Sequence, residues 1–196
     1  MEVEFIEQGH IYLVDGVITP SVSEILKFIF PNKYKDVPHR VLEEKALFGT
    51  HIHEAIEAYE KGKEPCLTDM ERVTFSQYLR FKEKYQIKPI EMEMIIHYKD
   101  LYAGRLDMTA YVKGLKSLID VKTTCKLDYE SLAWQLGMYK LAYGKARGIP
   151  IEKCYCLWLP KKDLGQLVEI EPKNKGDILE VLDRYEKQKD KIVFYF

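Results

Sequence analysis

The chain has 196 residues, and its 30 basic and 31 acidic side chains leave a formal net charge of −1. This length suits one domain, and 46% hydrophobic with 12% aromatic residues excludes a disordered chain. The small net charge excludes a polybasic, histone-like binder, although a local basic groove for nucleic acid stays compatible with it. No run of about 18 uncharged apolar residues occurs. The acidic residues 1–8 do not fit a secretory signal, so we expect a cytoplasmic protein without a membrane span.

Apolar periodicity and turn residues divide the chain into elements. The first forty residues predict a hairpin over 4–17, closed by Asp15-Gly16, and then a short helix that begins with the capping box Ser21/Glu24. The elements expected after these are helices at 41–61 (a break at Gly49-Thr50 being left open) and 69–85, strands at 90–98, 101–112 and 117–121, a helix at 129–147, strands at 153–159 and 166–170, and a helix at 174–189. This order indicates a single mixed α/β domain over 1–196, a central mixed sheet flanked by helices, with residues 1–40 as an appendage.

The candidates for chemistry lie on the second and third strands of the consecutive set. Asp107 falls within the second strand, and Asp120 and Lys122 end the third. Residues two apart in a strand face one side, so Asp120 and Lys122 project together, and the tight connection brings Asp107 beside Asp120. Adjacent carboxylates repel unless a cation or a proton lies between them, and carboxylate oxygens suit Mg²⁺ or Mn²⁺. The Val121 carbonyl would add a ligand, and Lys122 could hold or deprotonate an attacking water or stabilise a phosphate.

Solvated edge-strand acids are the alternative interpretation, and for a lone aspartate it is the commoner one. Here, however, the carboxylates interrupt apolar runs such as Leu118, Ile119 and Val121. Buried unpaired acids are costly, so a metal site accounts for them more economically.

Four motifs in a fixed order resemble those of the PD-(D/E)xK nuclease superfamily, and more narrowly its RecB-like exonuclease branch. They are Gly49-Thr50-His51-Ile52-His53, Gly104-Arg105-Leu106-Asp107, Asp120-Val121-Lys122 and Gln135-Leu136-Gly137-Met138-Tyr139. The segment 12–26, with Pro20-Ser21-Val22-Ser23, also resembles phage-encoded and mitochondrial genome maintenance exonucleases. The resemblance implies a restriction-endonuclease-like α-β-β-β-α-β core, which agrees with the order of elements above.

The resemblance also implies a metal centre for Mg²⁺ or Mn²⁺. It implies Asp107, Asp120 and Lys122 as catalytic residues, with His53, Asp107, Asp120 and the Val121 carbonyl as metal ligands. By composition either His51 or His53 could be the ligand, since the two face different sides of a helix, and the motif selects His53. An imidazole ligand would favour Mn²⁺ over an all-oxygen site.

Further positions are implied to support the site or contact DNA. Gln135 and Tyr139 lie four apart on one helical face, although an ordinary amphipathic helix would also place them so. Glu93 corresponds loosely to an acid of such nucleases, but Glu91 is expected to face the same side. Thr123 and Thr124 could bind phosphate or simply end the strand. Candidate phosphate contacts elsewhere are Lys33, Lys35, Arg40, Lys161 and Lys162.

The implied function is that of a metal-dependent DNA exonuclease that hydrolyses phosphodiester bonds, in phage-type or bacterial recombination and repair. Its partners would be linear DNA, single- or double-stranded, and a single-strand annealing or single-strand-binding protein. The alternatives are a structure-specific endonuclease on the same core and a catalytically inactive DNA-binding module.

The cysteines predict that no iron–sulfur cluster is present. Cluster-bearing RecB-like nucleases use one cysteine before the histidine motif and three near the C-terminus, whereas Cys66 here follows His53. Cys154 and Cys156 lie two apart on an expected strand, as core residues do, and Cys125 follows the lysine motif. We expect reduced thiols, with the strand pair acting as small hydrophobes.

Overall fold

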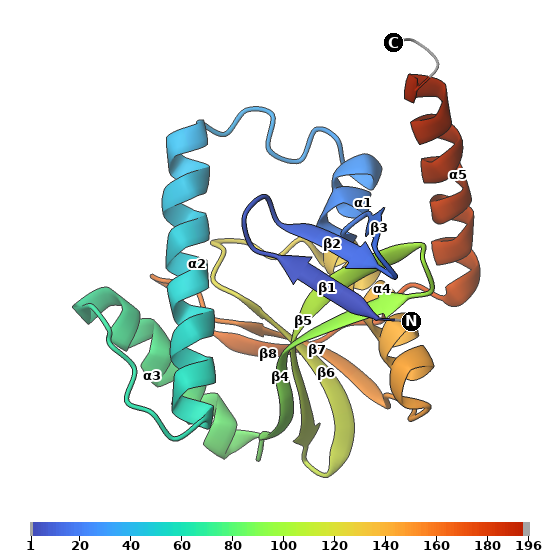
Figure 1. The fold of residues 1–196 in the computed structure, drawn as a ribbon. Coiled ribbons are helices and arrows are strands. Elements are labelled where there is room, and N and C mark those ends of the chain that lie inside the picture. The colour runs from blue at the N-terminus through green and yellow to red at the C-terminus, as the bar shows by residue number, and fades with distance from the viewer. Residues whose placement is uncertain (1, 194–196) are drawn as a thin grey trace.

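The structure is a computed structural model that describes residues 2–193, with side chains described up to residue 188. Figure 1 shows the arrangement of its helices and strands. In chain order these are β1 (Val3–Ile6), β2 (Ile11–Val14), β3 (Val17–Thr19), α1 (Val22–Ile29), α2 (His39–Glu60), α3 (Asp69–Lys84), β4 (Lys88–Tyr98), β5 (Tyr102–Val112), β6 (Leu115–Lys122), α4 (Tyr129–Arg147), β7 (Lys153–Trp158), β8 (Gln166–Glu169) and α5 (Lys175–Val193).

A five-stranded mixed sheet forms the centre of the fold, in the order β4-β5-β6-β7-β8. The first three strands form an antiparallel meander, β7 runs parallel to β6, and β8 returns antiparallel to β7. Parallel neighbours need a long crossover, and α4 supplies it between β6 and β7. The predicted mixed α/β class, with a central sheet flanked by helices and the α-β-β-β-α-β order, is confirmed.

Both faces of the central sheet are covered by helices, which explains the apolar character of β6. On one face, Leu118 packs with α1, α4 and α5 residues such as Ile25 and Leu136. On the other face, Val121 packs with α2 and α3 residues such as Ile52 and Tyr78. A strand buried on both faces reads as a continuous hydrophobic run rather than an alternating one.

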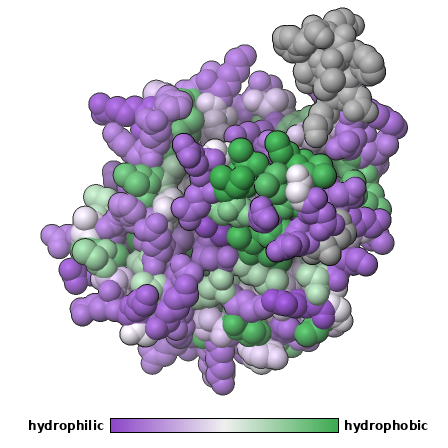
Figure 2. All heavy atoms as spheres, in the orientation of Figure 1, coloured by the Kyte–Doolittle hydropathy of each residue, from purple (hydrophilic) through white to green (hydrophobic). Residues whose placement is uncertain are grey.

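The N-terminal segment differs from its prediction. The turn between β1 and β2 lies at residues 7–10, so that Phe5 pairs with Tyr12, while Asp15-Gly16 joins β2 to β3. The predicted hairpin closed by Asp15-Gly16 is therefore wrong, and the segment is a three-stranded antiparallel sheet. The reason is geometric: both turn residues have positive φ, at 50° and 78°, and such a two-residue turn pairs the residues directly beside it. Figure 2 shows apolar surface over this small sheet.

The two N-terminal helices largely follow their predictions. The capping box of α1 is confirmed, because Ser21 Oγ accepts a hydrogen bond from the Glu24 N–H at 3.1 Å and the Glu24 carboxylate accepts one from the Ser21 N–H at 2.6 Å. The helix α2 continues without a break through Gly49-Thr50. None of the helices described here combines the length and apolar character needed to cross a membrane.

Close contact between β5 and α4 depends on the glycine at position 104. A Cβ atom at Gly104 would lie 2.9 Å from Tyr139 Cε1 and 3.1 Å from Val22 Cγ2. The Tyr102 hydroxyl on the same strand donates a 2.8 Å hydrogen bond to the Met138 carbonyl. The glycine of the Gly104–Asp107 motif thus lets the tyrosine of the Gln135–Tyr139 motif lie directly on the strand.

Substitution of Gly104 tests this contact. We expect Gly104→Ala to lower the free energy of unfolding by about 1–3 kcal/mol, because the added methyl group overpacks the contact with Tyr139. Urea unfolding monitored by circular dichroism measures the change. The matched control is Gly144→Ala in α4, where a Cβ would meet no heavy atom within 4 Å; it should raise stability by about 0.5–1 kcal/mol. Equal stability of Gly104→Ala and the wild type would contradict the role of this glycine.

Candidate active site

The alternation of side chains between the two faces of the sheet is interrupted in two neighbouring strands, β4 and β5. The interruption falls at the same level in both strands. In β4, Met92 packs with the apolar cluster of α2 and α3, but Met94 packs with the cluster of α1, α4 and α5. In β5, Leu106 belongs to the cluster of α1, α4 and α5, and Met108 belongs to the cluster of α2 and α3. Residues two apart in a regular strand face one side, so each strand is distorted at the residue between its pair.

Glu93 and Asp107 occupy this point. Glu93 has φ of 47°, in the left-handed region that non-glycine residues rarely adopt, at a cost of about 1 kcal/mol or more. Pairing between β5 and β6 runs only to Met108–Ile119, and beyond it the Asp107 carboxylate accepts a 2.7 Å hydrogen bond from the Val121 N–H. A carboxylate thus replaces the main-chain ladder, and the two strands separate around it.

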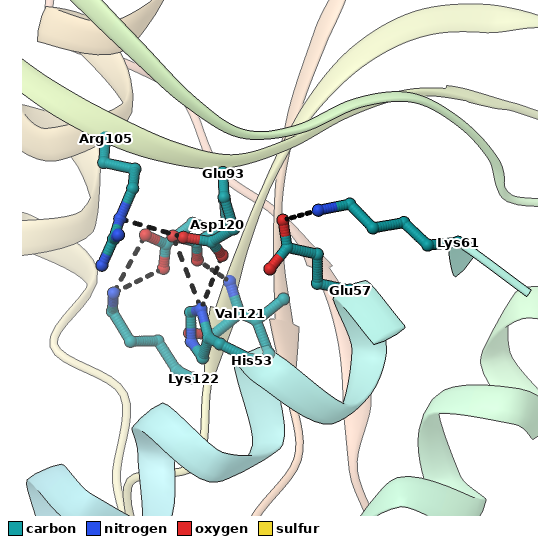
Figure 3. A network of polar contacts seen from close by, with 9 residues as sticks. His53, Glu57, Lys61, Glu93, Arg105, Asp120, Val121 and Lys122 are labelled. Carbon is teal, nitrogen blue, oxygen red and sulfur yellow. Dashed lines mark hydrogen bonds and ion pairs between the residues drawn. The ribbon is translucent and has the colours of Figure 1, made fainter. Parts of the chain in front are cut away.

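The helix α2 brings His53 against these carboxylates (Figure 3). Its Nδ1 lies 3.4 Å from Glu93 Oε1 and 3.7 Å from Asp107 Oδ1, and its Nε2 lies 3.1 Å from the Val121 carbonyl oxygen. All three neighbours are acceptors, which favours a proton on both ring nitrogens. Burial lowers the pKa of His53, but the Asp107 and Glu93 carboxylates outweigh it and raise that pKa to about 9.

Asp120 and Lys122 form a second, more deeply buried pair. The Lys122 Nζ lies 2.9 Å from Oδ1 and 2.8 Å from Oδ2 of Asp120, whose side chain is 2% exposed. Only Oδ1 receives a well-directed hydrogen bond, and within the described residues Oδ2 has none. Burial raises the pKa of Asp120 to about 6 while Lys122 opposes the rise. Burial lowers the pKa of Lys122, but Asp120 and Asp107 hold it above its ordinary range.

The structure therefore groups the predicted site residues in two sets, and Glu93, predicted only as a supporting residue, joins the predicted ligands His53 and Asp107. His53, Glu93 and Asp107 each offer one ligand atom within 4.8 Å of the others, so they could hold a metal ion together. The Val121 carbonyl joins this set through its contact with His53. Asp120 does not belong to this set. It pairs with Lys122 on its own strand, β6, which neighbours β5.

A hollow of about 600 Å³ opens beside the first set. Its wall includes His53, Asp107, Gln135 and Tyr139, so both residues of the predicted helical motif line the same hollow as the Asp107 carboxylate. Tyr139 is buried, and burial, together with the negative charges of Asp107 and Asp120, raises its pKa well above the ordinary value.

The two threonines after Lys122 differ in their surroundings. Thr123 Oγ1 lies 3.4 Å from the position of a Cβ built on Gly49 of α2, so this side chain faces the helix that carries His53. The Thr124 hydroxyl instead donates a 2.9 Å hydrogen bond to the Lys126 carbonyl. Thr124 therefore shapes the loop after β6.

Arg105 is a residue of the site that sequence reasoning missed. Its Nε lies 3.1 Å from Glu93 Oε2 (Figure 3). Its position two before Asp107 on a strand was the signal that could have revealed it. Glu91, the alternative to Glu93, points elsewhere, because it accepts a hydrogen bond from the Tyr143 hydroxyl at 3.0 Å and pairs with Arg147.

Other sequence candidates lie away from the carboxylates. The ring of His51 contacts Glu71 of α3, with Nδ1 2.8 Å from Oε1. Arg40 pairs with Glu44 along α2, and the Lys161 Nζ lies 3.7 Å from the centre of the Phe48 ring. Among the cysteines, Cys154 and Cys156 are buried on β7, and Cys66 and Cys125 are exposed.

No family model matches the chain, and no curated protein matches it. Two solved structures are similar to this chain at low sequence identity. SSO0001 has a TM-score of 0.47 and 16% identity over 90% of this chain and 76% of its own. A protein from Eubacterium rectale named "putative exonuclease" has a TM-score of 0.48 and 12% identity over 74% of this chain and 66% of its own. Likenesses of this size assign no roles to residues.

The protonation of His53 predicts a pH dependence of stability in metal-free protein. Because its pKa is raised from 6.5 to about 9, protonated His53 contributes to the free energy of unfolding. This contribution is complete below pH 6.5 and disappears as the pH rises through 9. We expect the stability advantage of wild type over His53→Gln, which cannot titrate, to shrink by up to about 3 kcal/mol across this range. Urea unfolding in chelator at several pH values measures the difference. A difference that stays constant from pH 6 to 9.5 would show that His53 is not the titrating cation.

Proposed function

We propose that the chain is a divalent-metal-dependent DNA exonuclease of the PD-(D/E)xK type, in its RecB-like branch. The observation that carries this proposal is the convergence of His53, Glu93 and Asp107 within 4.8 Å, directly beside the buried Asp120–Lys122 pair. The four sequence motifs that suggested a nuclease lie on four separate elements. Three of these motifs, those of His53, Asp107 and the Asp120–Lys122 pair, meet at this point.

The donor set fits a divalent cation. It combines carboxylate oxygens, a main-chain carbonyl and one imidazole nitrogen, which suits Mg²⁺ and favours Mn²⁺ somewhat more. The buried Oδ2 of Asp120 contacts the Lys122 ammonium group at 2.8 Å without a well-directed hydrogen bond, so this oxygen keeps a lone pair that a divalent cation could use. We propose His53, Asp107, Asp120 and the Val121 carbonyl as the ligands, with Glu93 as a further one. A bound divalent cation supplies charge neutralisation and a more acidic water.

Lys122 is better suited to stabilise charge than to act as a base. Its ammonium group is held between carboxylates, and its pKa lies above the ordinary value for lysine. A group that keeps its proton can stabilise a phosphate that gains negative charge during hydrolysis. Arg105, next to Glu93, contributes a second positive charge to the wall of the same hollow.

Two rival functions are separable by experiment. An inactive DNA-binding module would not need the complete set of Asp107, Asp120 and Lys122. A structure-specific endonuclease would cut closed circular DNA, whereas an exonuclease requires an end. Recombination or repair in the cytoplasm of a bacterial or phage-infected cell, with a single-strand annealing or single-strand-binding protein as partner, is the setting that the sequence motifs suggest.

Loss of the central charges should abolish hydrolysis. We expect Asp107→Asn, Asp120→Asn and Lys122→Ala each to lower the rate on end-labelled linear DNA by about 100-fold or more, because each removes a charge that acts on the transition state. The rates are measured with Mg²⁺ and with Mn²⁺, and circular dichroism checks that each variant is folded.

The matched control is Asp100→Asn, an exposed acid in the turn between β4 and β5, which should keep the wild-type rate. Wild-type cleavage by folded Asp120→Asn would refute the mechanism. Equal cleavage of linear and closed circular DNA by the wild type would favour the endonuclease.

The two histidines of α2 should differ in metal affinity. We expect His53→Ala to weaken Mn²⁺ binding by about 10-fold or more, because loss of a ligand should cost at least as much as loss of an outer partner. His51→Ala, the matched control, removes only the contact with Glu71 and should change the affinity little. Calorimetric titration of both variants measures the affinities. Equal losses, or the reverse order, would show that His53 is not a ligand.

A further inference from the structure

A second hollow, of about 640 Å³, lies next to the one at the carboxylates. Ser23 of α1 and Gln135 of α4 line both hollows, so these two side chains lie at the boundary between them. The second hollow is bounded by α1, α2, the start of α4, the loop after β6 and the 30–38 connection, which arches between α1 and α2 in Figure 1. Lys122, the proposed catalytic lysine, lines this second hollow, whereas Glu93 and His53 line the first.

The two hollows carry opposite charge. The charged groups of the first are Glu7, Glu54, Glu57, Glu93, Asp107, Arg105 and His53. The charged groups of the second are Lys27, Lys33, Lys45, Lys122, Lys126 and Asp128. The one carboxylate of the second hollow is already neutralised, because Asp128 Oδ2 lies 2.8 Å from Lys33 Nζ. A polyanion is therefore attracted to the second hollow and repelled from the first in the absence of a cation.

Aromatic and apolar side chains lie between these lysines. Phe30, Tyr34, Leu42 and Leu127 line the same wall, and Tyr34 is 52% exposed. The Lys33 Nζ lies 5.9 Å from the centre of the Phe30 ring and 5.6 Å from that of Tyr34, while its ion pair with Asp128 ties this connection to α4. Cations interleaved with one exposed ring, Tyr34, and one half-buried ring, Phe30, match the backbone and the unstacked bases of a single strand. A duplex presents its phosphates but shelters its base faces.

We propose that an unpaired DNA strand lies in the lysine-lined hollow and reaches the carboxylates past Ser23 and Gln135. The hollow gives this chain its preference for single-stranded over duplex DNA. The assignment rests on the proposed nuclease function for its direction toward the carboxylates, but binding in the hollow needs neither metal nor hydrolysis.

Binding is tested on the full chain in chelator, where no hydrolysis occurs. The probe is a fluorescent oligothymidine of twelve nucleotides, followed by anisotropy against salt concentration, and a blunt duplex of the same length is the comparison. Lys27→Glu/Lys45→Glu reverses two exposed lysines of the hollow that form no ion pair with a described side chain. We expect roughly 10-fold weaker single-strand binding and a salt slope smaller by about 2.

The matched control is Lys63→Glu/Lys88→Glu, which makes the same charge change at exposed positions outside the hollow and should lose much less affinity. Tyr34→Ala should weaken binding about 10-fold, and Tyr34→Phe should restore it, because stacking needs the ring and not the hydroxyl. Equal losses in both lysine pairs, or a blunt duplex bound as tightly as the single strand, would overturn the proposal.

The same variants separate this inference from the proposed function. If the wild type lacks nuclease activity with Mg²⁺ and Mn²⁺ but Lys27→Glu/Lys45→Glu still loses single-strand binding, the hollow stands and the nuclease proposal fails. If the wild type digests DNA and the hollow variant binds and digests single strands as the wild type does, the nuclease proposal stands and the hollow is wrong.

Discussion

The site depends on balancing three carboxylates that the fold forces into a small, partly buried space. Glu93, Asp107 and Asp120 come from three adjacent strands, and ionised acids at such distances repel one another strongly. In the metal-free protein, three cations offset them: protonated His53, Lys122 and Arg105. His53 lies on α2, whereas Lys122 and Arg105 lie on β6 and β5. The packing of α2 against the sheet therefore brings in one of the three cations, and the attraction of that cation to the carboxylates in turn favours the packing.

The local backbone explains why the carboxylates meet where they do. Regular alternation would place Glu93 and Asp107 on one face and continue the ladder past them. Instead both strands change face at these residues, Glu93 takes positive φ, and the Asp107 carboxylate occupies the hydrogen-bonding position of a strand neighbour. Strain of this kind persists only where the surroundings fix it. Here the apolar clusters on the two faces of the sheet hold the flanking residues, so the distortion is confined to the polar positions.

Much of this fold could be predicted because its elements are long and periodic. Helix α4 has the predicted bounds 129–147, and the order of the central strands follows from period-two runs and short turns. The N-terminal turn was placed wrongly because Asp15-Gly16 closes the nearer strand pair and not the farther one. Glu93 could not be separated from Glu91 because period-two reasoning assumes regular φ, which fails between them. Arg105 lies two residues before Asp107 on the same strand, but its ion pair with Glu93 also depends on the distorted backbone at Glu93, which the sequence does not show.

The separation of charge between the two hollows suits the metal-dependent site that we propose. Carboxylates that hold a cation also repel phosphate until the cation is bound, so affinity for a polyanion cannot come from the same residues. The lysines surround a neighbouring hollow, and Ser23 and Gln135 lie at its boundary with the hollow of the carboxylates. Lys122 belongs to both functions, since Asp120 holds its ammonium group beside the carboxylates while its side chain lines the basic hollow. A DNA strand held by these lysines would therefore meet the carboxylates at Lys122, the lysine that Asp120 holds beside them.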